Sequence, residues 1–82
     1  MEKSEITSRI KGIIAGMFDI KPEAVPDSKP FTEMAKYDSM RALEFLAKLE
    51  NEFEVTIDPD QLRDMSTVEK SCQVVEGRLH AK

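Results

Sequence analysis

Three stretches of the chain carry apolar residues at the 3.6-residue period of an amphipathic helix. The first is residues 4–17, whose apolar stripe consists of Ile6, Ile10, Ile13, Ile14 and Met17. Ser4 is a suitable N-cap, since its hydroxyl can accept a hydrogen bond from a first-turn N–H. Gly12 and Gly16 each cost a helix up to about 1 kcal/mol relative to Ala. We therefore expect packing, rather than helix propensity, to hold the first helix.

Residues 39–53 predict a second helix, which follows the polar pair Asp38-Ser39. Asp38 is the expected N-cap, and its carboxylate also suits the positive end of the helix dipole. The apolar positions form two lines, one of Leu46, Leu49 and Phe53 with Ala42 and Phe45 beside it, and one of Met40, Leu43 and Ala47. If one line faces the core, the second is partly exposed. An exposed apolar strip edged by Glu44, Glu50 and Asn51 is typical of a binding surface.

Two capping patterns predict further helices after residue 57. Asp58 precedes Pro59 and Gln61, which indicates a capping box and a short helix over about residues 59–63. Ser66 and Glu69 repeat the spacing and predict a last helix over about residues 67–80. The buried stripe of that last helix consists of Val68, Cys72, Val75 and Leu79. Residues 54–57 alternate like a strand but have no partner strand, so an extended connection is expected.

The segment between the first two helices, residues 18–38, is long and contains three prolines. Its spaced apolar residues can anchor it to the core, and one short turn can form at residues 22–25. These anchors are Phe18, Ile20, Val25 and Phe31. The predicted fold is all-α, with one domain over residues 1–82. It is a small four-helix bundle of three longer helices and one short helix, with a long ordered loop after the first.

Composition narrows the classes of function. Acidic residues outnumber basic ones by 16 to 12, so the net charge is -4. Nucleic acid is not expected as the main partner, because phosphate binding needs clustered Lys and Arg. No apolar stretch approaches the roughly 20 residues of a membrane span, and the start of the chain lacks the apolar segment of a signal peptide. With a single cysteine, no disulfide can form within the chain. We expect a monomer in the cytoplasm.

Catalysis and metal binding receive little support from the sequence. His80 is the only histidine, and no Gly-x-Ser-x-Gly elbow surrounds Ser39, so a Ser-His-acid triad is not expected. The carboxylates of residues 58–64 resemble a calcium loop, but Arg63 stands where that loop needs a glycine. We expect no enzyme activity and no metal site. Ser39 remains open to two interpretations, a simple part of the helix start or a point of attachment.

The motifs in this order resemble the acyl carrier protein family, which attaches 4'-phosphopantetheine to the serine of an Asp-Ser-Leu motif at the start of its second helix. Here the motif is Asp38-Ser39-Met40, preceded by FTEM and followed by KLENEFEVTI and STVE. The resemblance runs over about residues 6–79. It implies a non-enzymatic carrier whose arm is attached to Ser39, with Asp38 as part of the recognition signal. The implied partners are a phosphopantetheinyl transferase, an acyl- or aminoacyl-loading ligase and downstream synthase or transferase enzymes.

The sequence departs from the family pattern around this motif. Ala35 and Lys36, followed by Tyr37, stand where the family usually has Leu-Gly before its Asp. Met40 replaces Leu, and Arg41 stands where carriers of fatty-acid synthesis tend to have an acidic residue. These changes favour a specialised carrier, for a fatty-acid-like, polyketide, peptide or other dedicated pathway.

The helix after the serine supplies the residues that partners are expected to read. This expected recognition patch consists of Met40, Arg41, Leu43, Glu44 and Ala47. An alternative interpretation is a small helical interaction module that has the same fold but no prosthetic group. It predicts partner binding that does not depend on Ser39.

Overall fold

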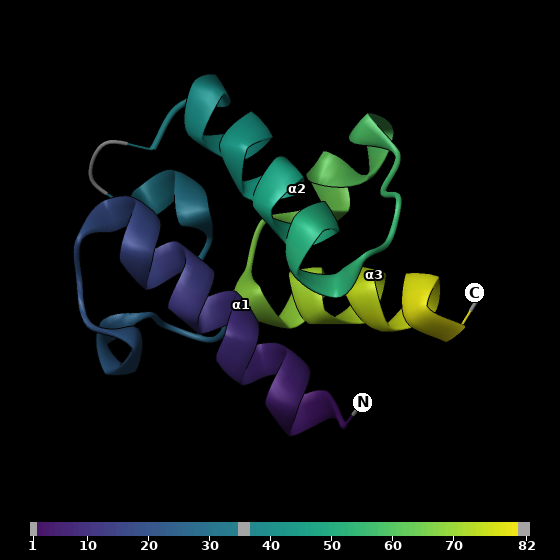
Figure 1. Cartoon of the computed structure of the whole chain (residues 1–82). Helices are drawn as coiled ribbons and strands as arrows, with labels where there is room; N and C mark the ends of the chain where they lie inside the picture. Colours follow the sequence, from purple (N-terminus) through teal and green to yellow (C-terminus); the bar gives the residue numbers. More distant parts are fainter. Residues whose placement is uncertain (1, 35–36, 81–82) are drawn as a thin grey trace.

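The computed structural model describes residues 2–34 and 37–80, apart from the side chain of residue 63. Three α-helices form the body of the molecule (Figure 1). They are α1 (Lys3–Phe18), α2 (Ser39–Phe53) and α3 (Val68–His80). Short 3-10 segments lie between them, namely η1 (Pro22–Ala24), η2 (Phe31–Glu33) and η3 (Pro59–Met65). The described ranges contain no strand, so the all-α prediction is confirmed. The expected fourth, short helix is instead the 3-10 segment η3.

The start of α1 differs from the prediction. The helix begins at Lys3 with Glu2 as its N-cap residue, and the backbone carbonyl of Glu2 accepts hydrogen bonds from the N–H groups of Glu5 and Ile6. Ser4 lies inside the helix, so it was wrongly predicted as the cap. No side chain caps this end, and the helix depends on its buried stripe.

The start of α3 also lies one residue from the predicted cap. Thr67 Oγ1 accepts a hydrogen bond from the Lys70 N–H at 3.0 Å, which makes Thr67 the capping residue in place of Ser66. Ser66 has a different role, because its backbone carbonyl accepts a hydrogen bond from the Phe31 N–H at 2.7 Å. The Ser71 hydroxyl, which is fully buried, donates to the Met65 carbonyl at 3.2 Å.

Two side-chain contacts fix the connection between α2 and α3. The predicted capping box of η3 is confirmed, with the Asp58 N–H donating to Gln61 Oε1 and the Asp58 carboxylate accepting from the backbone of the first turn. Glu50 Oε2 accepts a hydrogen bond from the Ile57 N–H at 2.9 Å. Glu50 was expected at the edge of an exposed strip, and this was wrong. Its half-buried carboxylate holds the extended residues 54–57 against α2.

The core is one cluster to which all three helices and the long loop contribute. Its aromatic centre is Phe31, which is 1% exposed and packs edge-to-face on Phe45 with ring centroids 5.3 Å apart. Val25 is also buried and Phe18 packs against the core, so three of the four predicted loop anchors are confirmed. Ile20 is not an anchor, because it is 38% exposed. The chain turns there through Asp19, whose left-handed φ of 56° ends α1.

Backbone and ionic contacts hold the loop between α1 and α2 in place. Lys11 of α1 forms an ion pair with the Asp27 side chain. The Asp27 carbonyl accepts a hydrogen bond from the Glu69 N–H at 3.1 Å, at the start of α3. The described part of the loop is therefore tied to two helices, α1 and α3, as expected for an ordered loop (Figure 1). In the described part of the chain no helix combines the length and apolarity needed to cross a membrane.

Candidate attachment site

The start of α2 is capped by Asp38, as predicted. Its backbone is extended (φ -151°, ψ -178°), and Asp38 Oδ1 accepts a hydrogen bond from the Arg41 N–H at 2.8 Å. Ser39 is the first helical residue and is exposed. Since the cap satisfies only one of the first-turn N–H groups, the other donors of that turn remain directed outward. This end of the helix therefore presents a solvent-accessible hydroxyl beside a positive dipole end, which favours an anion.

The second apolar line of α2 is exposed, as its spacing indicated. Met40 is 77% exposed and Leu43 is 56% exposed, and Ala47 is exposed one turn further on. Phe45 and Leu49, by contrast, are buried in the core. The exposed strip begins at the residue after Ser39, so an enzyme that reaches this serine also meets apolar surface.

Charged side chains of α2 lie along the same strip. Arg41 Nη1 is 3.0 Å from Glu44 Oε1, and Lys48 Nζ is 3.9 Å from Glu44 Oε2. A recess of about 320 Å³ is lined by Asp38, Met40, Arg41 and Glu44. The five residues of the expected recognition patch therefore lie within three turns of one helix and are at least partly accessible.

Tyr37 precedes the cap and packs into the aromatic part of the core. Its ring stacks on Phe18 and lies tilted against Phe31, with centroids 6.4 Å apart in both pairs. Burial raises the pKa of the Tyr37 hydroxyl above its ordinary value of 10.0. In the sequence Tyr37 stood out only as a departure from the family pattern. The structure shows that it links the loop before α2 to α1. The two residues before it, 35 and 36, also depart from the family pattern, but they lie outside the described residues.

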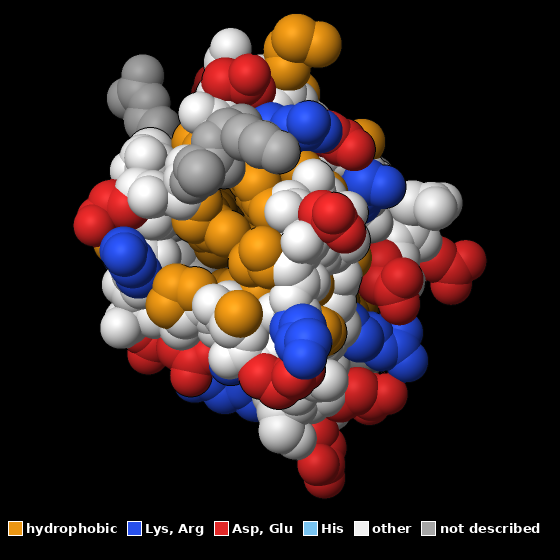
Figure 2. Space-filling view, turned by 90° about the vertical axis from the view of Figure 1, so that its left-hand side faces the viewer, with side chains coloured by type: hydrophobic (Ala, Val, Ile, Leu, Met, Phe, Trp, Pro, Cys, Tyr) orange, Lys and Arg blue, Asp and Glu red, His pale blue; other side chains and the backbone are white. Residues whose placement is uncertain are grey.

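The side of the molecule on which the loop lies carries apolar surface. Figure 2 views this side and shows hydrophobic side chains gathered in a hollow, with charged side chains around it. The end of α1 and the loop supply partly buried apolar side chains that pack on the core. These are Met17, Phe18, Met34 and Tyr37.

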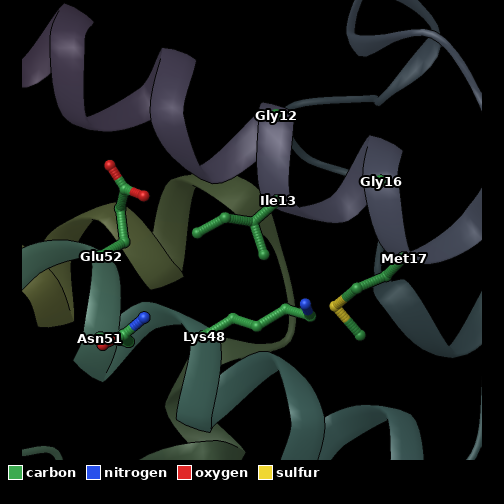
Figure 3. Close-up of a pocket in the computed structure, with 7 residues that line it drawn as sticks. All are labelled: Gly12, Ile13, Gly16, Met17, Lys48, Asn51 and Glu52. Atoms are coloured by element: carbon green, nitrogen blue, oxygen red, sulfur yellow. The ribbon is translucent and has the colours of Figure 1, made fainter.

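A second hollow, of about 350 Å³, lies between α1 and α2 (Figure 3). Gly12 and Gly16 form part of its α1 wall, and a methyl group added to either would meet no atom within 4 Å. Lys48 of α2 extends across it toward Met17 (Figure 3). Glu52, at the other end, is paired with Arg9 at 3.1 Å. This hollow has no signal in the sequence, because it depends on how two helices are placed.

The structure offers the serine no partner for catalysis among the described residues. His80 ends α3, and Figure 1 places that end well apart from the start of α2. Within residues 2–34 and 37–80 no group of three or more His, Cys, Asp or Glu side chains is arranged to hold a metal ion. Cys72 is fully buried, as its place in the apolar stripe predicted.

A small helical domain that offers an accessible serine at a helix start, beside an exposed apolar strip, has the features of a carrier rather than of an enzyme. The family model described as phosphopantetheine attachment site matches residues 8–75. The acyl carrier protein of Thermosynechococcus vestitus is 30% identical over 81 residues, which cover 99% of this chain and all of that protein. The acyl carrier protein of Buchnera aphidicola is 32% identical over 73 residues, which cover 89% of this chain and 91% of that one.

A solved structure of the acyl carrier protein from Enterococcus faecalis has the same fold. It superimposes with a TM-score of 0.78 at 26% identity, covering 95% of this chain and 99% of that one. The chain therefore belongs to the acyl carrier protein family. Its prosthetic group is 4'-phosphopantetheine, which bears the acyl group, and the protein is a carrier and not an enzyme. The exposed hydroxyl and the anion-favouring helix end at the start of α2 fit a phosphodiester-linked arm.

Proposed function

We propose that Ser39 carries the 4'-phosphopantetheine arm and that the protein delivers acyl or aminoacyl groups, as thioesters, to the enzymes of a specialised biosynthetic pathway. The observation that carries the proposal is the start of α2, where Asp38 caps the helix at 2.8 Å from the Arg41 N–H and leaves Ser39 accessible. The pathway is fatty-acid-like, polyketide or another dedicated one. The whole chain acts as one domain, as a monomer in the cytoplasm.

The proposed chemistry divides between the arm and the chain. The arm supplies a thiol that holds the cargo, and its tether raises the concentration of that cargo at each partner. The chain supplies a phosphate-compatible helix end and the apolar strip beside it. Loading of Ser39 forms a bond from its Oγ to the arm's phosphorus, breaks the bond from that phosphorus to the nucleotide half of coenzyme A, and releases the serine proton to a base of the transferase.

The partners in this proposal are a phosphopantetheinyl transferase, a loading ligase and downstream synthase or transferase enzymes. All of them must approach the start of α2, since the arm is attached there. The expected recognition patch of Met40, Arg41, Leu43, Glu44 and Ala47 occupies the same side of the helix. This common location supports the assignment of the patch to partner recognition.

The test is the intact mass of the protein after incubation with coenzyme A and a broad-specificity phosphopantetheinyl transferase. The wild-type protein is expected to gain the mass of one arm, and Ser39→Ala is expected to gain none. The chain offers a matched control in Ser28→Ala, because Asp27-Ser28 is a second Asp-Ser pair on the exposed loop. This control should gain the arm as the wild type does. A mass gain that persists in Ser39→Ala would refute the assignment.

A further inference from the structure

The first turn of α2 has no side chain in the core. Residues 38–44 are exposed or half-buried, and none of them is among the apolar side chains that form the core or pack on it. The first core residue of the helix is Phe45, six positions after Ser39. A helix end that is held only by its own cap opens readily, because few tertiary contacts oppose its fraying. The turn that carries Ser39 therefore depends on an anchor that precedes the helix.

Tyr37, two residues before Ser39, is placed to be that anchor. Its ring stacks on Phe18 at the end of α1 and lies tilted against Phe31 of η2, with centroids 6.4 Å apart in both pairs. Its N–H donates a hydrogen bond to the Met34 carbonyl at 3.3 Å. These contacts come from elements other than α2, so they hold the helix start independently of the hydrogen bonds of the helix itself.

Phe31 joins this anchor to the body of α2. It packs edge-to-face on Phe45, with centroids 5.3 Å apart, and its N–H donates to the Ser66 carbonyl at 2.7 Å. Ser39 therefore lies between two aromatic side chains, Tyr37 and Phe45, that pack on the same ring. Because that ring is buried and its backbone is bonded to the segment before α3, it sets the position of the helix start relative to the core.

We propose that Tyr37 is a positioning residue for arm transfer, whose ring holds the first turn of α2 so that Ser39 Oγ meets the phosphorus of coenzyme A in one geometry. The inference rests on the proposed function, since it takes Ser39 as the modified residue. In the transfer step a bond forms from Ser39 Oγ to the arm's phosphorus and the bond from that phosphorus to the nucleotide half of coenzyme A breaks. The serine proton passes to a base of the transferase.

Alignment of the hydroxyl decides how fast this step is. A displacement of about 1 Å between reacting groups lowers a rate by up to about a hundredfold. A serine on a frayed turn spends part of its time outside the productive geometry. Tyr37 acts through the backbone that it anchors and takes no part in the bonds that form and break.

The test measures the first turnover of arm transfer from coenzyme A, with a broad-specificity phosphopantetheinyl transferase in excess and at varied concentration. A single turnover separates the chemical step from product release. Tyr37→Ala removes the ring, whereas Tyr37→Phe keeps the ring and loses only the hydroxyl. Val75→Ala is the control for lost stability, because Val75 is a fully buried residue of α3, which lies apart from the start of α2 (Figure 1).

The positioning role and a merely structural role predict different results. Partial unfolding lowers the fraction of competent carrier, which raises the half-saturating concentration of transferase and leaves the limiting rate unchanged. Val75→Ala should show this pattern. Tyr37→Ala should instead lower the limiting rate by about tenfold, and Tyr37→Phe should restore it. The pattern of Val75→Ala in Tyr37→Ala would overturn the proposal, as would an equal loss of rate in Tyr37→Phe.

Amide hydrogen exchange followed by NMR tests the anchor without coenzyme A or a transferase. The N–H groups of Arg41 and Ala42 report on the first turn, since they donate to Asp38 Oδ1 at 2.8 Å and to the Asp38 carbonyl at 3.0 Å. Their exchange should be about tenfold faster in Tyr37→Ala and unchanged in Val75→Ala, because the first turn opens locally. If Tyr37→Ala does not fold, Phe18→Leu removes the stacking partner instead and should have the same effect to a smaller degree.

The two measurements separate the possible failures. Unchanged exchange of the first turn in Tyr37→Ala would overturn the anchor itself. Faster exchange with an unaltered limiting rate would overturn the positioning role, while the arm found on Ser39 would still support the proposed function. Absence of the arm from Ser39 in the wild type would overturn the proposed function and the role in arm transfer, even with faster exchange in Tyr37→Ala.

Discussion

Replacement of Asp38 separates its part in the fold from its part in recognition. In Asp38→Ala the hydrogen bond from the Arg41 N–H, 2.8 Å long in the native protein, is lost. Loss of an N-cap costs about 0.5–2 kcal/mol, typically about 1, and loss of the carboxylate at an exposed helix end adds about 0.3–1 kcal/mol. Asp38→Asn keeps an oxygen acceptor and loses only the charge. We therefore expect a loss of about 1–2 kcal/mol for the alanine variant and less than about 1 kcal/mol for the asparagine variant.

Urea unfolding and thermal unfolding, both followed by circular dichroism, measure the free energy of unfolding and the Tm of the two variants. For a domain of this size, about 1 kcal/mol corresponds to a change in Tm of about 4–8 °C. Asp64→Ala is a suitable control, because Asp64 is exposed and contributes no cap, and its effect should be within about 0.5 kcal/mol of zero. The two Asp38 variants are then compared for the rate of arm transfer. If the carboxylate is part of the recognition signal, both variants are slow although only one is unstable.

Equal destabilisation by Asp38→Ala and Asp38→Asn would refute the hydrogen-bond argument, since it would assign the whole effect to the charge. An unchanged stability of Asp38→Ala would refute the capping argument itself. Normal arm transfer to both variants would limit Asp38 to a structural role.

Three further predictions concern the fold. Glu50→Ala should lower the free energy of unfolding by about 1.5–3 kcal/mol, because the Ile57 N–H loses a charged acceptor at 2.9 Å, and Glu50→Gln should lower it less. Gly12→Ala and Gly16→Ala should each raise the free energy of unfolding by up to about 1 kcal/mol, since the added methyl meets no atom within 4 Å. The raised pKa of Tyr37 should make stability fall as the pH rises above about 10, because the unfolded chain releases the phenolic proton first; Tyr37→Phe should remove this contribution.

Urea titrations check all three, at neutral pH for the first two and across pH 9–12 or so for Tyr37. Glu50→Ala with wild-type stability would show that the Ile57 hydrogen bond contributes nothing. Destabilisation by either glycine substitution would mean that the hollow between α1 and α2 cannot accept a side chain. Identical pH curves for the wild type and Tyr37→Phe would contradict the burial of that hydroxyl.

Local patterns in the sequence predicted much of the fold. The apolar spacing of residues 39–53 indicated α2 with one buried and one exposed line, and Asp38 and Asp58 were identified as caps. These features involve residues a few positions apart, and side chains at that distance meet whenever the helix forms. Ser39, the proposed attachment residue, was singled out for the same reason, since its motif is local and its exposure follows from its place at the helix start.

Features that depend on tertiary contacts or on the path of the backbone beyond a helix were missed. Ser66 is the better cap by residue type, yet Thr67 caps the helix, and a long-range hydrogen bond from the Phe31 N–H to the Ser66 carbonyl accompanies this outcome. Glu50 is polar and lies beside the exposed strip in sequence, yet it turns toward the Ile57 N–H. Ile20 is apolar but exposed, because the left-handed Asp19 turns the chain after α1. None of these outcomes follows from periodicity alone.

The charged residues of α2 could be predicted only in part. Arg41, Glu44 and Lys48 are visible in the sequence at ion-pair spacing, but the shared use of Glu44 by two cations is a property of their side-chain geometry. The unusual Arg41 thus becomes interpretable only once its partner is known.

Attachment of the arm to Ser39 is tested most directly by locating the modification with tandem mass spectrometry. The protein is modified with coenzyme A and a transferase, digested, and its peptides are sequenced. We expect one modified peptide, which contains Ser39, and an unmodified peptide that contains Ser28. An arm found on any other residue, or a Ser39 peptide that remains unmodified while the intact protein gains mass, would contradict this expectation.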